Sequence, residues 1–264
     1  MSDHPKRGAA QSAEPGSASV DSLASEALSV VASRKQSGSL IERFVSELTD
    51  AVQRDAPDMM FEVRDRMLDS GISPVDISDF YVPEAARRLG EAWCADETSF
   101  AAVTIGASRL QGLLRTLGAE WSAQELAEPN APASLIIVAH EVYHTLGAVI
   151  LSGQLRRRGY AVRLLIGMQP DKLEHLIRQT TYDVVMISAS SGDRLEPLRV
   201  LVEKVKDAVS EPPPVIVGGT VLEQKLDVRT LTGADYVTSD LNEALEYCGL
   251  SSPQKMPAHN DSGR

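Results

Sequence analysis

The chain has few cysteines and lacks a long hydrophobic run. Its two cysteines, Cys94 and Cys248, are too few and too far apart for a disulfide framework, so we expect a reducing compartment. No stretch approaches the ~20 apolar residues that a membrane span needs, and residues 1–15 lack the apolar core of a secretory signal. These absences predict a cytoplasmic protein without a membrane partner.

Basic residues are also in the minority. The chain has 26 Lys and Arg against 37 Asp and Glu, a formal net charge of −11. Proteins that hold nucleic acid by neutralising phosphates need a surplus of Lys and Arg. Direct contact with DNA is therefore expected to be absent or weak, and any role in gene regulation should run through a protein partner.

Both ends of the chain are polar, and the segment after the first end has helical periodicity. Residues 1–38 are expected to form a disordered or weakly helical tail and residues 251–264 a disordered tail, since their composition buries little apolar surface. Between 39 and 127 apolar residues such as Phe44 and Leu48 recur at helical spacing in four runs. This segment is predicted to be a small bundle of about four helices.

From residue 133 to 250 the pattern changes to alternating strands and helices. Nearly continuous runs of Val, Ile and Leu predict strands at 134–139, 161–166, 183–188, 214–217 and 235–237. Amphipathic stretches begin near Thr145, Pro170, Arg194, Val221 and Asp240. Such strands, each followed by a helix, indicate a parallel sheet covered on both faces. The predicted fold class is α/β, a flavodoxin-like, doubly wound five-stranded parallel sheet preceded by the helical bundle.

Polar and small residues follow the strands that meet at the expected ligand site. A doubly wound sheet binds ligands beyond the carboxyl ends of its strands, where the strand order reverses. The segments found there are 140–147 (HEVYHTLG), 188–190 (SAS) and 218–220 (GGT). His144 offers an imidazole for a transition metal. Gly218 and Gly219 would let the backbone approach a bulky ligand, so large substitutions there are expected to block binding without unfolding the domain.

The three segments resemble the signature of cobalamin-binding domains of the methionine synthase and mutase type, Asp-x-His-x-x-Gly, then Ser-x-Leu, then Gly-Gly. The resemblance implies that His144 is the lower axial ligand of the cobalt in cobalamin, with the hydroxo or adenosyl form left open. It also implies the following set of cofactor-binding residues: Tyr143, His144, Thr145, Leu146, Gly147, Ser188, Ala189, Ser190, Gly218, Gly219 and Thr220.

Two positions depart from that signature. Val142 stands where the signature has Asp, and Ser190 stands where it has Leu. In those domains the Asp hydrogen-bonds the ligating His and tunes the cobalt–ligand bond, a device that Val142 removes. The departure favours a sensor over an enzyme that cycles cobalt through several oxidation states.

The helical segment carries a second resemblance. Residues 82–93 (VPEAARRLGEAW), followed by 96–100 (DETSF), resemble the helical cap of light-sensing cobalamin regulators, in which a Trp covers the upper face of the corrin. That likeness implies corrin contact by Trp93, whereas periodicity alone makes Trp93 a core residue of the bundle. Segment 154–159 (QLRRRG) completes a likeness to the PpaA/AerR antirepressors of anoxygenic phototrophic bacteria, which runs from about residue 40 to 248.

The PpaA/AerR resemblance implies a function. It implies a non-enzymatic, cobalamin-dependent transcriptional regulator that senses light or redox state. Its expected partner is a DNA-binding repressor of the PpsR/CrtJ type, which controls photosystem genes and which the regulator antagonises.

Alternative interpretations of the same segments stay open. The chain could be a corrinoid carrier protein of a methyltransferase system. His140-Glu141-x-x-His144 is also the zinc-peptidase pattern, although here it follows a strand directly instead of lying within a helix. The basic residues 156–158 are interpreted as the solvated end of a helix, where positive charge complements the helix dipole.

Overall fold

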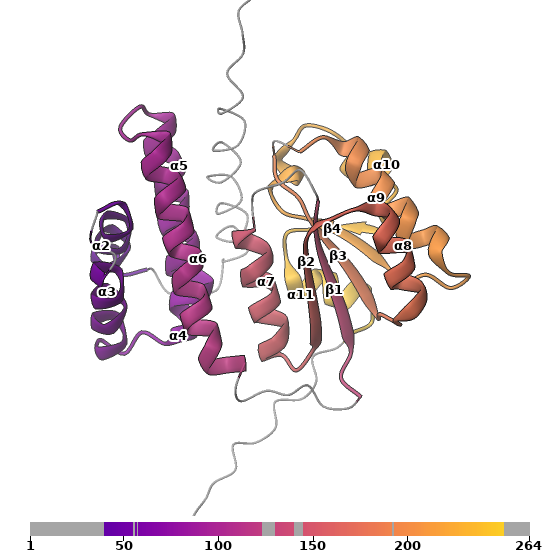
Figure 1. Cartoon of the computed structure of the whole chain (residues 1–264), viewed down its shortest axis with the longest axis horizontal. Helices are drawn as coiled ribbons and strands as arrows, with labels where there is room; N and C mark the ends of the chain where they lie inside the picture. The colour runs from indigo at the N-terminus through magenta and orange to yellow at the C-terminus, as the bar shows by residue number, and fades with distance from the viewer. Residues whose placement is uncertain are drawn as a thin grey trace, which may run out of the picture.

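The structure of the chain is a computed structural model. It describes residues 40–54, 56, 58–122, 130–139, 145–191 and 193–250. Both predicted tails lie outside these residues. In the described part a group of helices lies beside an α/β unit, and helix α7 lies between them (Figure 1).

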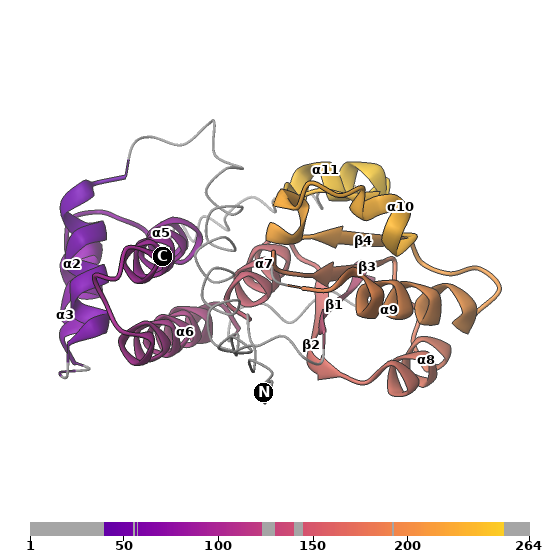
Figure 2. The same ribbon diagram turned by 90° about the horizontal axis from the view of Figure 1, so that it is seen from above.

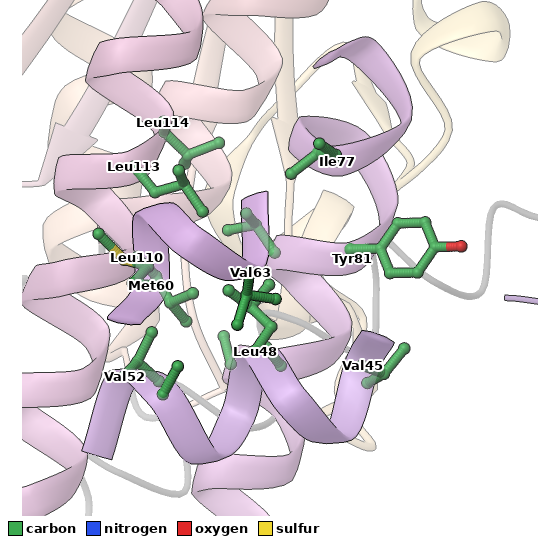
Figure 3. Close-up of a cluster of buried hydrophobic side chains, with 14 of the residues drawn as sticks. Val45, Leu48, Val52, Met60, Val63, Ile77, Tyr81, Leu110, Leu113 and Leu114 are labelled. Atoms are coloured by element: carbon green, nitrogen blue, oxygen red, sulfur yellow. The ribbon is translucent and has the colours of Figure 1, made fainter. Parts of the chain in front are cut away.

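Long helices occupy the four apolar runs of the first segment. They are α2 (Glu42–Gln53), α3 (Asp58–Asp69), α5 (Val82–Cys94) and α6 (Phe100–Ser122). Their apolar residues recur every three or four positions, so each helix turns one buried stripe toward the others. Figure 3 shows part of the resulting core, in which Leu48, Val63 and Leu110 come from α2, α3 and α6. The predicted helical segment before the sheet is confirmed.

A π-helical turn connects the short helix α4 (Pro74–Asp76) to α5. In this turn, η1 (Ile77–Tyr81), the backbone N–H of Val82 donates to the carbonyl of Ile77, five residues earlier. The turn lies where Pro83 lacks the N–H that a regular α-helix would aim at the carbonyl of residue 79. No sequence pattern predicted this widened turn, which places Asp79 on the side of the bundle that faces α7.

The second half forms one parallel sheet. Its strands are β1 (Ala133–Ala139), β2 (Ala161–Met168), β3 (Val184–Ser188), β4 (Val215–Gly218) and β5 (Tyr236–Val237). They pair in the order β2-β1-β3-β4-β5, and every pairing is parallel. This is the predicted doubly wound sheet, in which β1 and β3 flank the point where the strand order reverses.

Helices cover both faces of the sheet (Figure 2). One face packs against α7 (Leu146–Arg157) and α11 (Leu241–Tyr247), and the other against α8 (Pro170–Gln179), α9 (Leu195–Ala208) and α10 (Val228–Thr232). The prediction of a helix that begins near Val221 was wrong, because the 3-10 turn η2 (Thr220–Glu223) occupies that position. Helix α10 begins only after Asp227, whose side chain accepts a hydrogen bond from the backbone N–H of Thr230.

Helix α7 buries two sides. Ala148 and Leu155 pack against the sheet, whereas Leu146 and Ile150 belong to the core of the helical bundle. At its C-terminal end, Nη2 of Arg157 lies 2.6 Å from both carboxylate oxygens of Asp79. The side chain of Arg157 is only 14% exposed, so the interpretation of residues 156–158 as a solvated face was wrong at this position. One helix therefore joins the two parts of the molecule.

Within the described residues, no helix combines the length and apolar character needed to cross a membrane.

Candidate functional site

The pairing of the strands brings the segments that begin at Ser188 and Gly218 together. The segment that follows β1 begins beside them. Val138 near the end of β1 pairs with Ser188, and Ser188 pairs with Gly218 at the end of β4. The carboxyl ends of these neighbouring strands therefore meet at one edge of the sheet. Tyr143 and His144, together with residues 140–142, lie outside the described residues. The chain on either side of them is described, from Ala139 at the end of β1 and from Thr145 onward.

The described end of the first segment contacts the helical bundle. Thr145 precedes α7 and is half-buried, and its Oγ1 accepts a hydrogen bond of 2.9 Å from Nε2 of Gln111 in α6. Leu146 is buried and Gly147, the second residue of α7, is half-buried. The sequence had not singled out Gln111, because its partner lies 34 residues away and no local pattern marks the pair.

The segments after β3 and β4 are held to each other by hydrogen bonds. The backbone N–H of Ala189 donates to the carbonyl of Gly218 at 2.9 Å, and the backbone N–H of Ser191 donates to Oγ1 of Thr220 at 2.9 Å. Thr220 is fully buried. Because the bonds run between two separate loops, these loops form one rigid floor at the edge of the sheet.

Ser190 and Asp193 place a buried hydroxyl and a half-buried carboxyl at this edge. The backbone N–H of Ser190 donates to Oδ2 of Asp193 at 2.7 Å, and burial raises the pKa of the Asp193 carboxyl. Oγ of Ser190 is buried and has no well-aligned hydrogen-bond partner among the described residues, although Asp193 lies close enough to interact with it. A buried hydroxyl without a full partner leaves hydrogen-bonding capacity for a polar ligand. Ser188 is half-buried beside it.

Gly218 and Gly219 lie close to backbone atoms of neighbouring segments of the same chain. A Cβ on Gly218 would lie 2.6 Å from the carbonyl oxygen of Thr238, and a Cβ on Gly219 would lie 2.3 Å from that of Ala189. Gly219 also has φ of +99°, which L side chains rarely adopt. This geometry argues against the expectation that large residues here would leave the domain folded, because the first atom of any side chain meets backbone that cannot rotate away.

Trp93 lies in the last turn of α5. It is half-buried and packs against the core of the helical bundle, as its periodicity indicated. Its contact with a corrin stays a prediction. Neighbouring Cys94 is exposed.

The described residues contain no group of three or more His, Cys, Asp or Glu that could hold a metal ion. His140, Glu141 and His144, the residues of the candidate zinc-peptidase pattern, lie outside the described residues. Residues 133–246 match the model of the B12 binding domain family, and this match includes the whole His-Glu-x-x-His segment. The fold and the match together define the class of the protein: it carries a cobalamin-binding domain behind a helical bundle.

A curated relative identifies the family. Over 167 residues the chain is 38% identical to an uncharacterized 20.5 kDa protein in the bchF-crtJ intergenic region of Rhodobacter capsulatus, an alignment that covers 63% of this chain and 87% of the relative. The chain therefore belongs to the family of that protein, and the resemblance to the PpaA/AerR group is confirmed.

A solved structure shares the fold. The monomethylamine corrinoid protein of Methanosarcina barkeri superposes with a TM-score of 0.61 at 17% identity, covering 80% of this chain and 99% of that protein. At this identity the likeness supports the arrangement of helices and sheet alone.

The residues at the sheet edge fit cobalamin, the cofactor of this domain family. The buried hydroxyl of Ser190 and the half-buried hydroxyls of Ser188 and Thr145 offer hydrogen bonds to a polar group. The loop that carries His144 starts and ends at the same edge. The described part of the edge thus presents neutral hydroxyls, which suit the polar tail of cobalamin.

Proposed function

We propose that this chain is a cobalamin-dependent transcriptional regulator without enzymatic activity, an antirepressor that responds to light or redox state. Its proposed target is a repressor of photosystem genes of the PpsR/CrtJ type. The observation that carries the proposal is the family membership: the Rhodobacter capsulatus relative is described by its place beside crtJ, and both the B12 domain and the helical bundle are present in this chain.

In this proposal the chain's own residues hold the cofactor in two places. His144 binds the cobalt from the lower side, and Ser188 and Ser190 donate or accept hydrogen bonds at the polar tail, on the floor formed by the β3 and β4 loops. When bound, cobalamin supplies a cobalt ion whose upper ligand can change on illumination or oxidation. Val142 provides no carboxylate to relay a proton to His144, which suits a sensor.

The response requires that cobalamin binds two conformations unequally, because equal affinity shifts no equilibrium. Trp93 belongs to the helical bundle and the loop of His144 belongs to the α/β domain, so a corrin between them would contact both. A change of the upper ligand would then alter the position of the bundle against the α/β domain, and with it the surface that the repressor contacts.

Capture of the repressor by three forms of the protein tests the proposal. Tagged full-length protein is prepared as apo-protein, as holo-protein with hydroxocobalamin in the dark, and as illuminated holo-protein, and each is mixed with a purified PpsR/CrtJ-type repressor. We expect capture to differ between the forms. Equal capture by all three would eliminate the sensor role and leave cobalamin binding in place.

Two variants locate the response. Trp93→Ala is expected to reduce the difference between forms while His144 ligation stays intact. Phe61→Ala is the matched control, because Phe61 is also a half-buried aromatic residue packed against the same core but lies on α3, on the far side of the bundle from the α/β domain (Figure 2). An equal effect of both variants would assign the change to loosened packing instead of to corrin contact.

The corrinoid-carrier interpretation is the second candidate, and the fold shared with the monomethylamine corrinoid protein is compatible with it. A carrier loaded with methylcobalamin passes its methyl group to an acceptor in the presence of a partner methyltransferase. Retention of the methyl group in such assays, together with state-dependent repressor capture, would favour the regulator.

A further inference from the structure

The loop that follows β3 is tied to the segment that follows β4 by side chains of that second segment. Gln224 is the first residue after η2, and its Nε2 donates hydrogen bonds to the carbonyls of Ser191 at 2.8 Å and Asp193 at 3.1 Å. These partners lie 33 and 31 residues away in the chain. Thr220, at the start of η2, accepts the bond from the backbone N–H of Ser191. The position of the β3 loop therefore depends on the segment after β4.

The same loop carries the buried hydroxyl of Ser190, which is 1% exposed. The backbone of Ser190 is engaged on both sides, because its N–H donates to the carboxylate of Asp193 at 2.7 Å and its carbonyl accepts from the N–H of Asp193 at 2.9 Å. Its Oγ, in contrast, has no well-aligned partner among the described residues. Such a hydroxyl serves a ligand only if its backbone is held within about 0.5 Å of the productive position.

From these contacts we infer that Gln224 is a positioning residue for the polar tail of cobalamin. Its amide acts through the β3 loop: it fixes the backbone on the C-terminal side of Ser190, and so keeps the floor between the β3 and β4 loops in shape before the cofactor arrives. The inference rests on the proposed binding of the tail at this floor. It follows that Gln224 should contribute to affinity only for corrinoids that have a tail.

Two corrinoids that differ in the tail test the inference. Hydroxocobalamin has the phosphate, ribose and base, whereas aquacobinamide has the same ring and ends before the phosphate. The dissociation constants of both are measured with the full-length protein by visible-spectrum titration. Gln224→Met keeps the length of the side chain and removes both N–H donors, so the β3 loop must be ordered when the tail binds. We expect hydroxocobalamin to bind about tenfold more weakly, the effect of one or two lost neutral hydrogen bonds, and aquacobinamide to bind unchanged.

A matched variant in the bundle separates positioning from the loss of a hydrogen bond in general. Gln53 of α2 is also half-buried, and its Nε2 donates to a backbone carbonyl, that of Thr49, at 3.2 Å. Helix α2 lies on the far side of the bundle from the α/β domain (Figure 2). We expect Gln53→Met to leave both dissociation constants unchanged. If Gln224→Met also lowers the thermal midpoint of the apo-protein, the ratio of the two constants still decides, because a loosened domain would weaken both corrinoids alike.

The outcomes distinguish this inference from the proposed function. Failure of the unaltered protein to bind either corrinoid would refute the proposed cobalamin binding itself. Equal affinity of the unaltered protein for both would overturn the inference together with the proposed contacts to the tail. Tighter binding of hydroxocobalamin that persists at the same ratio in Gln224→Met would overturn the positioning role alone. A ratio that changes about tenfold in Gln224→Met and stays constant in Gln53→Met would support it.

Discussion

Replacing Gly219 by Ala should destabilise the α/β domain strongly, even though the substitution adds one methyl group. Two costs add. Gly219 has φ of +99° and ψ of −171°, a region that is populated almost only by Gly and costs other residues about 1–3 kcal/mol. The new Cβ would also lie 2.3 Å from the carbonyl oxygen of Ala189, and relieving such an overlap costs about 1–3 kcal/mol more. We expect Gly219→Ala to lower the free energy of unfolding by about 2–6 kcal/mol.

Urea unfolding of the apo-protein measures this cost, with Gly233→Ala as the matched control. Gly233 also has positive φ, +74°, but nothing lies within 4 Å of a Cβ built there, so only the backbone cost of about 1–2 kcal/mol applies. The difference between the two variants reports the overlap with Ala189 together with the smaller difference between their backbone costs. Equal destabilisation by both variants would refute the predicted overlap with Ala189. Gly219 would then be required only for its positive φ.

Other variants test the cofactor ligand, the helix that joins the two parts and its ion pair. His144→Ala is expected to abolish or severely weaken the binding of hydroxocobalamin, about one per unaltered chain, while His140→Ala has a smaller effect in the same visible-spectrum titration. Ile150→Ala should cost about 2–5 kcal/mol in urea unfolding, because it opens a cavity where α7 enters the bundle core. Burial raises the pKa of Asp79 above its ordinary value of 3.8, so its contribution to stability is fully present below that value and is lost as the pH rises through the raised pKa. Asp79→Asn should abolish this loss, which unfolding measurements at a series of pH values rising from 3.8 detect by comparison with the unaltered protein.

The strands were predictable because the apolar runs follow directly from burial. Residues 134–139 of β1 are all buried, and a strand covered on both faces needs such a run. Sequence alone also predicted the adjacency of the segments after β3 and β4, since parallel strands end at one edge. It missed the late start of α10, because the cap by Asp227 competes with the helical spacing that begins at Val221.

The contacts between the bundle and the α/β domain could not be predicted. Gln111 and Thr145 are 34 residues apart, and Asp79 and Arg157 are 78 apart. These pairs depend on how whole elements pack, and the π turn that presents Asp79 has no simple signature. The interpretation of Arg157 as solvated failed for the same reason. The close approach of Gly219 to Ala189 likewise depends on a neighbouring loop, so it could not be predicted from the Gly-Gly pair in the sequence.

The central claim, that cobalamin controls an interaction with a repressor, is tested most directly by thermodynamic linkage. The dissociation constant of hydroxocobalamin is measured with the protein alone and with a saturating PpsR/CrtJ-type repressor. If cobalamin changes the affinity for the repressor by a given factor, the repressor must change the affinity for cobalamin by the same factor. We predict a shift of about five- to 150-fold, the usual range of such coupling. An identical dissociation constant with and without the repressor would contradict the account.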